Sequence, residues 1–206
     1  MRKNIILTLA SLLILSIFLA GCTSNSPTST TTPVQTTASQ LSTIDPSDMA
    51  LTLSDIPAGF TIKDGTELVA SDMAKSAIEN GWEKGYSVGF ERTNNGLRTG
   101  ILDSEMIQQS INVYPIANLN QVMTNSANEE LQQANATVTV TQLPDPGIGD
   151  SSQAFRWTTE IAGIQVTQFY ISFIKKDVHE NLYMGGTSAD YETLKNLANV
   201  SASKIM

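Results

Sequence analysis

The stretch IQVTQFYISFI, from Ile164 to Ile174, decides the fold class of this chain. Side chains of a β-strand alternate between its two faces. One face of this stretch carries Val166 and Tyr170, and the other carries Phe169 and Phe173, so both faces are apolar. A strand of this kind is covered on both sides. The sequence therefore predicts a sheet with helices on each face.

Turn signals on both sides of this strand predict an antiparallel meander. Ala162-Gly163 separates it from an aromatic segment around 155–157, and Lys175-Lys176-Asp177 separates it from an apolar segment at 178–184. A helical apolar stripe over 191–205 follows a Gly-Gly pair. These elements predict three adjacent strands followed by a terminal helix capped by Ser188.

The rest of the domain adds further strands and helices. Apolar spacing predicts helices at 66–80 and 118–131 and strands at 60–62, 86–90, 107–113 and 135–141. Turn-forming residues predict a hairpin turn at 93–96 and a loop at 143–150. Residues 44–206 are thus expected to form a single globular α+β domain. Its predicted fold is a mostly antiparallel β-sheet with helices on both faces, a three-layer α/β/α sandwich.

The charge of this region limits its partners. All 20 acidic residues and ten of the 12 basic residues lie after Thr43, which gives a net charge near −10. Nucleic-acid binding needs a basic surface, and anionic lipid headgroups would repel an acidic one. No cysteine lies in this region, so no disulfide supports the fold.

The start of the chain carries an export signal. A basic start at Met1-Arg2-Lys3 precedes the apolar run from Ile5 to Ala20, and Leu19-Ala20-Gly21-Cys22 closes it. This tetrapeptide resembles the lipobox of bacterial and some archaeal lipoproteins. The resemblance implies that residues 1–21 are a signal peptide and that Cys22 carries lipid, with acyl chains such as palmitate in the membrane. The alternative is an uncleaved signal anchor with an incidental cysteine.

Both alternatives predict an extracytoplasmic domain that is anchored to the cell membrane. Residues 22–43 would comprise the lipidated Cys22 and a stalk. In residues 23–43, 13 of 21 positions are Ser or Thr and none is charged, a composition that predicts disorder. Asn135 and Asn199 match the N-glycosylation pattern and are expected to be unmodified.

Short motifs of the domain resemble those of PsbP-like lipoprotein domains. They are LSDIPAGF at 53–60, Gly85-Tyr86, IGDSSQAF at 148–155, and the terminal helix after a Gly-rich turn. Phe60 stands where the family commonly has tryptophan. The resemblance implies a binding, assembly or sensing role without catalysis, and it carries no functional residues over to this chain.

The sequence offers little for catalysis or cofactor binding. His179 is the single histidine, no Gly-x-Ser-x-Gly elbow is present, and Cys22 is assigned to the lipid. His179 is expected to face solvent on a strand. We therefore expect no catalytic residues, no cofactor and no zinc site.

Several carboxylates and aromatic residues leave alternatives open. Asp145 and Asp150 are weak calcium candidates on a Gly-containing loop, although turn capping explains them equally well. The pairs Asp103/Glu105 and Glu129/Glu130 are expected to be solvated, although a carboxylate pair in a cleft would suit a glycosidase. Four aromatic side chains could line a ligand groove, although a core position is favoured: Trp82, Tyr86, Trp157 and Tyr170.

Two functions follow from these observations. The favoured one is a lipid-anchored extracytoplasmic binding or accessory protein without enzymatic activity, whose partner is an envelope protein or a small ligand. The alternative is a surface hydrolase that uses Asp or Glu carboxylates, with or without calcium.

Overall fold

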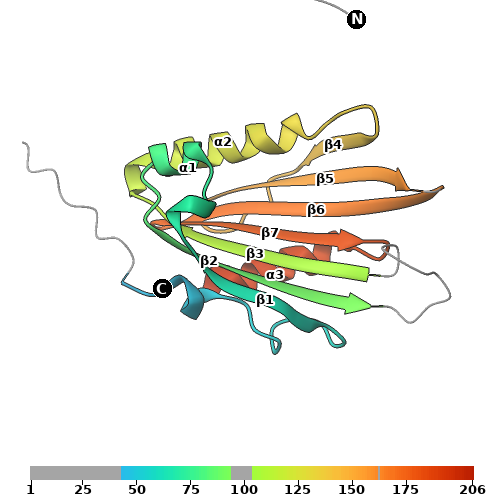
Figure 1. Cartoon of the computed structure of the whole chain (residues 1–206), viewed down its shortest axis with the longest axis horizontal. Helices are drawn as coiled ribbons and strands as arrows, with labels where there is room; N and C mark the ends of the chain where they lie inside the picture. Colours follow the sequence, from blue (N-terminus) through green and yellow to red (C-terminus); the bar gives the residue numbers. More distant parts are fainter. Residues whose placement is uncertain (1–42, 94–103, 162) are drawn as a thin grey trace, which may run out of the picture. The chain divides into compact units, whose positions relative to one another are not determined.

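The computed structural model describes residues 43–93, 104–161 and 163–206, which form one antiparallel sheet and its covering helices (Figure 1). The predicted signal peptide, Cys22 and the predicted stalk up to Ser42 lie outside the described residues, as does most of the expected 93–96 turn. The strands are β1 (Thr61–Leu68), β2 (Lys84–Thr93), β3 (Ser104–Val113), β4 (Val138–Leu143), β5 (Ser151–Ile161), β6 (Ile164–Lys175) and β7 (Val178–Gly186). The α-helices are α1 (Lys75–Glu79), α2 (Leu119–Gln132) and α3 (Tyr191–Lys204), with short 3-10 helices η1 (Pro46–Met49), η2 (Ala70–Asp72) and η4 (Ile116–Asn118).

The strands are arranged in the order β1-β2-β3-β7-β6-β5-β4, and every neighbouring pair is antiparallel. The meander β5-β6-β7 is present as the turn signals predict, with Tyr170 opposite both Phe155 and Tyr183. After the meander, β7 pairs with β3, which places strands from the two halves of the chain at the centre of the sheet.

One face of the sheet, which we call the core face, carries the main hydrophobic core. Ile107 and Ile111 of β3, Leu182 of β7 and Phe173 of β6 are fully buried there. Helix α3 covers this face with Leu194, Leu197 and Ala198, and the segment 44–60 adds Met49, Leu51 and Phe60. Asp190, rather than the predicted Ser188, caps α3, because its carboxylate accepts a hydrogen bond from the Thr193 N–H.

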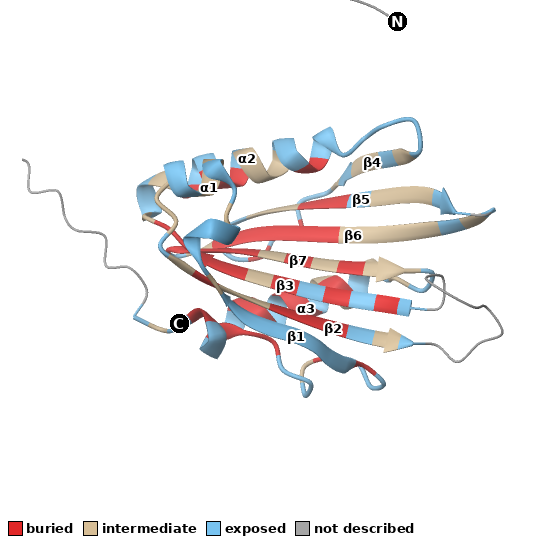
Figure 2. Ribbon diagram, in the orientation of Figure 1, coloured by how far each residue is buried: buried red, intermediate tan, exposed pale blue. Residues whose placement is uncertain are grey.

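The predicted three-layer α/β/α sandwich is wrong. The described chain is dominated by its seven strands, and its two longer helices, α2 and α3, have only 14 residues each. In β6 the buried residues are Tyr170–Ile174, and no residue of the first half of the strand is buried (Figure 2). The apolar pattern on both faces of this strand therefore reflects cover over half of its length. Within the described residues, no helix is both long enough and apolar enough to cross a bilayer.

The predicted helix at 66–80 is also wrong. Residues 61–68 form strand β1, which pairs with β2 across a register shift between Ile62 and Asp64. The only α-helical residues of the predicted range are Lys75–Glu79. Glu67 and Leu68 pair with Tyr86 and Gly85, so a long-range ladder overrides the local helical spacing.

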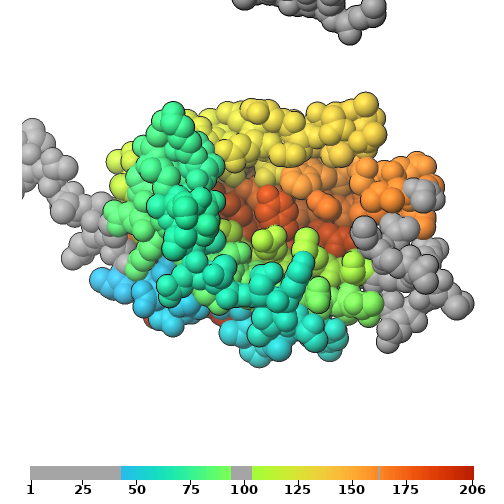
Figure 3. All heavy atoms as spheres, in the orientation of Figure 1, coloured from blue at the N-terminus to red at the C-terminus, as the bar shows by residue number. Residues whose placement is uncertain are grey.

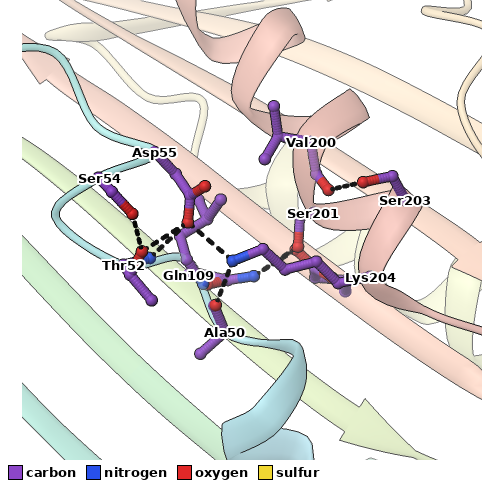
Figure 4. A network of polar contacts seen from close by, with 11 residues as sticks. Ala50, Thr52, Ser54, Asp55, Gln109, Val200, Ser201, Ser203 and Lys204 are labelled. Atoms are coloured by element: carbon purple, nitrogen blue, oxygen red, sulfur yellow. Dashed lines mark hydrogen bonds and ion pairs between the residues drawn. The ribbon is translucent and has the colours of Figure 1, made fainter.

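A buried polar network joins the core face to the two segments that cover it (Figure 4). The Gln109 amide accepts a hydrogen bond from the Leu51 N–H at 2.7 Å, and it donates to Glu180 at 2.7 Å and to Ser201 at 2.6 Å. Gln109, Glu180 and Ser201 are completely buried. Burial raises the pKa of Glu180 to about 8, so this carboxyl group keeps its proton at neutral pH. The network fixes α3 and the segment 44–60 on β3 and β7.

Lys204 strengthens the same attachment at the end of α3. Its ammonium group donates to the Ala50 carbonyl at 2.8 Å and lies 2.7 Å from the Asp55 carboxylate (Figure 4). Asp55 also accepts hydrogen bonds from the backbone and the hydroxyl of Thr52. Hydrogen bonds to Lys204 and Thr52 outweigh partial burial and hold the pKa of Asp55 below its usual value.

We predict that Gln109→Leu destabilises the domain by about 2 to 4 kcal/mol, because it leaves buried polar groups without a partner. Chemical denaturation monitored by circular dichroism measures this change. Gln108→Leu is the matched control, since Gln108 is an exposed amide on the other face of the same strand. It should change the free energy of unfolding by less than about 0.5 kcal/mol. Equal effects of both substitutions would contradict the role of the network.

Candidate functional site

The second face of the sheet, which we call the groove face, is only partly covered. Helix α2 lies along β6 and β7, where Ser126 bonds Tyr170 at 2.5 Å and Glu130 accepts from Tyr183 at 3.0 Å. The segment 69–82, which contains α1, forms a second ridge. Figure 3 shows a hollow between this segment in green, α2 in yellow and β1 in teal, with β7 in red at its floor.

The inner end of the hollow is a polar pocket of about 160 Å³. Its walls come from the segment 73–80 and from α2. Its floor consists of side chains from β3 and β7: Ser110, Asn112, His179 and Asn181. We call this site the inner pocket. Glu129 of α2 is the one charged side chain among the described residues that line it.

The outer end is a larger pocket of about 440 Å³. We call it the outer pocket. Its lining includes a row across four strands, in which Met106 pairs with Gly185, Gly185 with Gln168, and Gln168 with Trp157. The next row adds Gln108 of β3 and Tyr183 of β7, which are partners in the strand register.

The two pockets form one groove because they share lining residues. Ser110 and Asn181 line both. Asn181 is held in place by the Tyr170 hydroxyl, which donates to its side-chain oxygen at 2.7 Å. Asn112 is fixed similarly, since it accepts from the Trp82 indole at 2.9 Å and donates to Ser110 at 3.0 Å. The floor is therefore organised by hydrogen bonds within the protein.

Gly185 creates the depth of the outer pocket. It lies between Met106 and Gln168 and contributes no side chain to the row. A Cβ atom at this position would lie 3.0 Å from Cγ of Gln168. A larger residue would therefore project into the space that the pocket now occupies.

Aromatic rings form one wall of the outer pocket. Trp157 lies 5.7 Å from Tyr183 between ring centroids, and Tyr183 lies 4.7 Å from Tyr170. Of the four aromatic residues considered from sequence, Trp157 lines the outer pocket, Tyr170 is buried beneath α2, and Trp82 packs at the edge of the inner pocket. Tyr86 packs against the core on the opposite face.

Glu130 is buried, contrary to the solvated position expected from sequence. It is 6% exposed, and its second carboxyl oxygen has no partner among the described residues. Burial raises the pKa of Glu130 to about 7, with a smaller contribution from the charge of Glu129 and a partly opposing hydrogen bond from Tyr183. Glu129 itself is exposed, as expected. The two carboxyl groups thus occupy different environments.

His179 is also buried, although a solvent-facing position was predicted. Its Nε2 lies 2.8 Å from the Ser172 hydroxyl, and Tyr114 packs edge-on at 6.2 Å between ring centroids. Burial lowers the pKa of His179 to about 4, so the ring is neutral at pH 7. Ser172 of β6 is completely buried beneath Met123 of α2, so a substrate has no access to its hydroxyl.

The loop carboxylates accept hydrogen bonds from other residues of the protein. Asp145 accepts from the Gly147 N–H at 2.9 Å and from the Ser152 hydroxyl at 2.5 Å, and Asp150 accepts from the Lys176 N–H at 2.7 Å. Calcium binding at Asp145 and Asp150 stays a prediction. Among the residues that the structure describes, no group of three or more His, Cys, Asp or Glu side chains could hold a metal ion.

The remaining sequence candidates lie away from the groove. Glu105 is buried on the core face and pairs with Arg92, whereas solvation was expected; Asp103 lies outside the described residues. The Asn135 side chain accepts from Thr137, and the Asn199 side chain donates to the Lys195 carbonyl. Sequence reasoning missed Gln108, Gln168 and Gly185, for which the sequence contains no local signal.

Comparison with solved structures shows the fold. The chain resembles the crystal structure of the extracellular domain of PknH from Mycobacterium tuberculosis, with a TM-score of 0.59 and 10% sequence identity. The likeness covers 77% of this chain and 93% of that domain. No protein-family model and no curated protein sequence matches the chain.

Glu130 should make stability depend on pH. Because its folded pKa of about 7 lies above the ordinary 4.5, the unfolded chain releases the proton first, and stability falls as the pH rises from about 4.5 to 7. Glu130→Gln keeps an acceptor for Tyr183 and removes this penalty. We expect an unchanged melting temperature near pH 4 and an increase of roughly 2 to 5 °C at pH 8.

Differential scanning calorimetry at both pH values measures the effect of Glu130→Gln. Glu67→Gln, at an exposed glutamate of β1, is the control and should follow the wild-type profile. A Glu130→Gln variant whose melting temperature falls at pH 8 would contradict the buried, protonated state.

Proposed function

We propose that this chain is a lipid-anchored extracytoplasmic binding protein without catalytic activity, and that it receives a small ligand in the groove formed by the inner and outer pockets. The observation that carries the proposal is the outer pocket, a hollow of about 440 Å³ with aromatic and amide side chains on a sheet face. Its volume lies in the range of small-molecule sites.

Two observations support the location. The basic start, the apolar run and Leu19-Ala20-Gly21-Cys22 have the order of a lipoprotein signal. The PknH domain that shares the fold is extracellular by its description. A lipid anchor on Cys22 would hold the domain at the membrane, and two acyl chains suffice for stable attachment.

The groove side chains favour binding over chemistry. Catalysis by a carboxylate pair needs two carboxyl groups that face a common cleft. Among the described residues that line the groove, Glu129 is the one acidic residue, and Glu130 bonds Tyr183 from a buried position. Ser172 and His179 are close, but the serine is completely buried. The ligand would therefore be held and released unchanged.

We predict that Cys22 carries the lipid. In the native host, growth with an alkyne fatty acid should label the wild-type chain, and mass spectrometry should find Cys22 as the modified amino terminus. Cys22→Ser removes the thiol and should abolish the label, whereas Thr23→Ser should be labelled like the wild type. A wild-type chain that keeps Met1, or equal labelling of Cys22→Ser, would support the signal-anchor alternative instead.

We predict that ligands perturb methionines of the groove selectively. Met106 and Met73 line the outer and inner pockets, whereas Met49 is completely buried in the core. The probes are neutral oligosaccharides, short peptides and fatty acids, titrated into the detergent-solubilised full chain with 13C-methyl methionine. We expect at least one class to shift Met106 or Met73 and to leave Met49 unchanged in the NMR spectrum. No groove shift with any class would overturn the proposed function.

A further inference from the structure

We propose that the outer pocket binds a neutral carbohydrate, with sugar rings placed between Met106 and Trp157. This inference rests on the proposed function, because it names the ligand class of the same groove. Among the described residues, three features of the outer pocket carry it: an uncharged lining, two amide side chains without hydrogen-bond partners, and an aromatic wall beside Gly185.

The first feature is the uncharged lining. No Lys, Arg, Asp or Glu is among the described residues that line the outer pocket, although the domain as a whole is strongly acidic. An ionic ligand would lose hydration there without gaining a counter-charge. An anionic ligand would also meet the negative field of the domain. The pocket therefore selects a neutral ligand.

The second feature is the pair of amides at Gln108 and Gln168. They belong to β3 and β6, on the two sides of β7. Neither side chain makes a hydrogen bond with another residue in the described part of the chain. Each amide offers donors and an acceptor. Sugar hydroxyl groups both donate and accept, so they match these amides in either orientation.

The third feature is the wall formed by Trp157 next to Tyr183. A pyranose ring presents C–H groups on its faces and hydroxyl groups at its edge. The C–H groups carry partial positive charge and pack well on the negative face of an aromatic ring. Gly185 leaves the space between Met106 and Gln168 open for such a ring.

The size of the site also suits a short oligosaccharide. The row from Met106 to Trp157 crosses three strand spacings, which is about 14 Å. An acyl chain could fill this space, but it would strip water from both amides without replacing its hydrogen bonds. The polar inner pocket continues the same surface through Ser110 and Asn181 and could hold further hydroxyl groups.

The test is a titration of the detergent-solubilised full chain with chitotriose and maltotriose, followed by Met106 methyl NMR and by tryptophan fluorescence. Trigalacturonic acid is the anionic comparison. We expect at least one neutral trisaccharide to shift Met106 in a saturable manner, and the anionic one to bind at least ten-fold more weakly. Because Trp157 lines the site, its fluorescence should change with the same binding curve.

Three variants localise the binding. Gly185→Leu should abolish sugar binding by filling the pocket. Trp157→Ala should weaken the affinity about ten-fold, because it removes one aromatic ring contact. Gln108→Ala changes an exposed residue and should weaken binding several-fold in a chain of unchanged stability. Gln142→Ala, at an exposed glutamine of β4 outside the groove, is its matched control and should bind like the wild type.

The outcomes separate this inference from the proposed function. If short peptides or fatty acids shift Met106 and neutral sugars do not, the carbohydrate assignment is wrong and the groove still binds a ligand. If sugars bind but Gly185→Leu and Gln108→Ala bind equally well, the site lies elsewhere and the assignment is also wrong. If no class shifts Met106 or Met73, both proposals fail.

Discussion

The structure depends on a mismatch between the width of the sheet and the size of the helices that cover it. Seven strands at ~4.8 Å spacing span about 29 Å, whereas one helix with its side chains is about 10 Å wide. With one 14-residue helix over part of each face, a large area of sheet remains uncovered. On the core face the segment 44–60 fills much of the remainder. On the groove face the uncovered strands carry amides, Ser110 and aromatic rings, and these line the groove.

Neighbouring residues of β3 show how the two faces divide their roles. Gln109 faces the core, where its amide joins Leu51, Glu180 and Ser201 in a buried network. Gln108 faces the groove and makes no such bonds with the described residues. Of these two neighbouring glutamines, Gln109 stabilises the attachment of α3 on the core face, and Gln108 is available to a ligand on the groove face. Because α3 and the segment 44–60 are fixed by the first amide, the sheet offers the second one from a rigid support.

The local sequence predicted some parts of this arrangement and missed others. The meander around β6 followed from alternation and turn residues, which are local properties. The extent of helical cover could not be predicted, because it depends on where α2 packs on the sheet. The burial of Glu130 and His179 was missed because it also depends on tertiary contacts. Glu130 is buried against Tyr183, which is 53 residues away, and His179 is buried against Tyr114 and Ser172. Gly185 deepens a pocket only through partners on β3 and β6.

Native mass spectrometry of the full chain, gently released from the membrane of its own host, tests most directly whether the groove holds a ligand. The account predicts that the wild-type chain carries a non-covalent neutral adduct that collisional activation releases intact. The Gly185→Leu chain, isolated in the same way, should lack this adduct because leucine occupies the hollow between Met106 and Gln168. If the wild-type and Gly185→Leu chains differed in mass only by the substitution itself, the result would contradict the account.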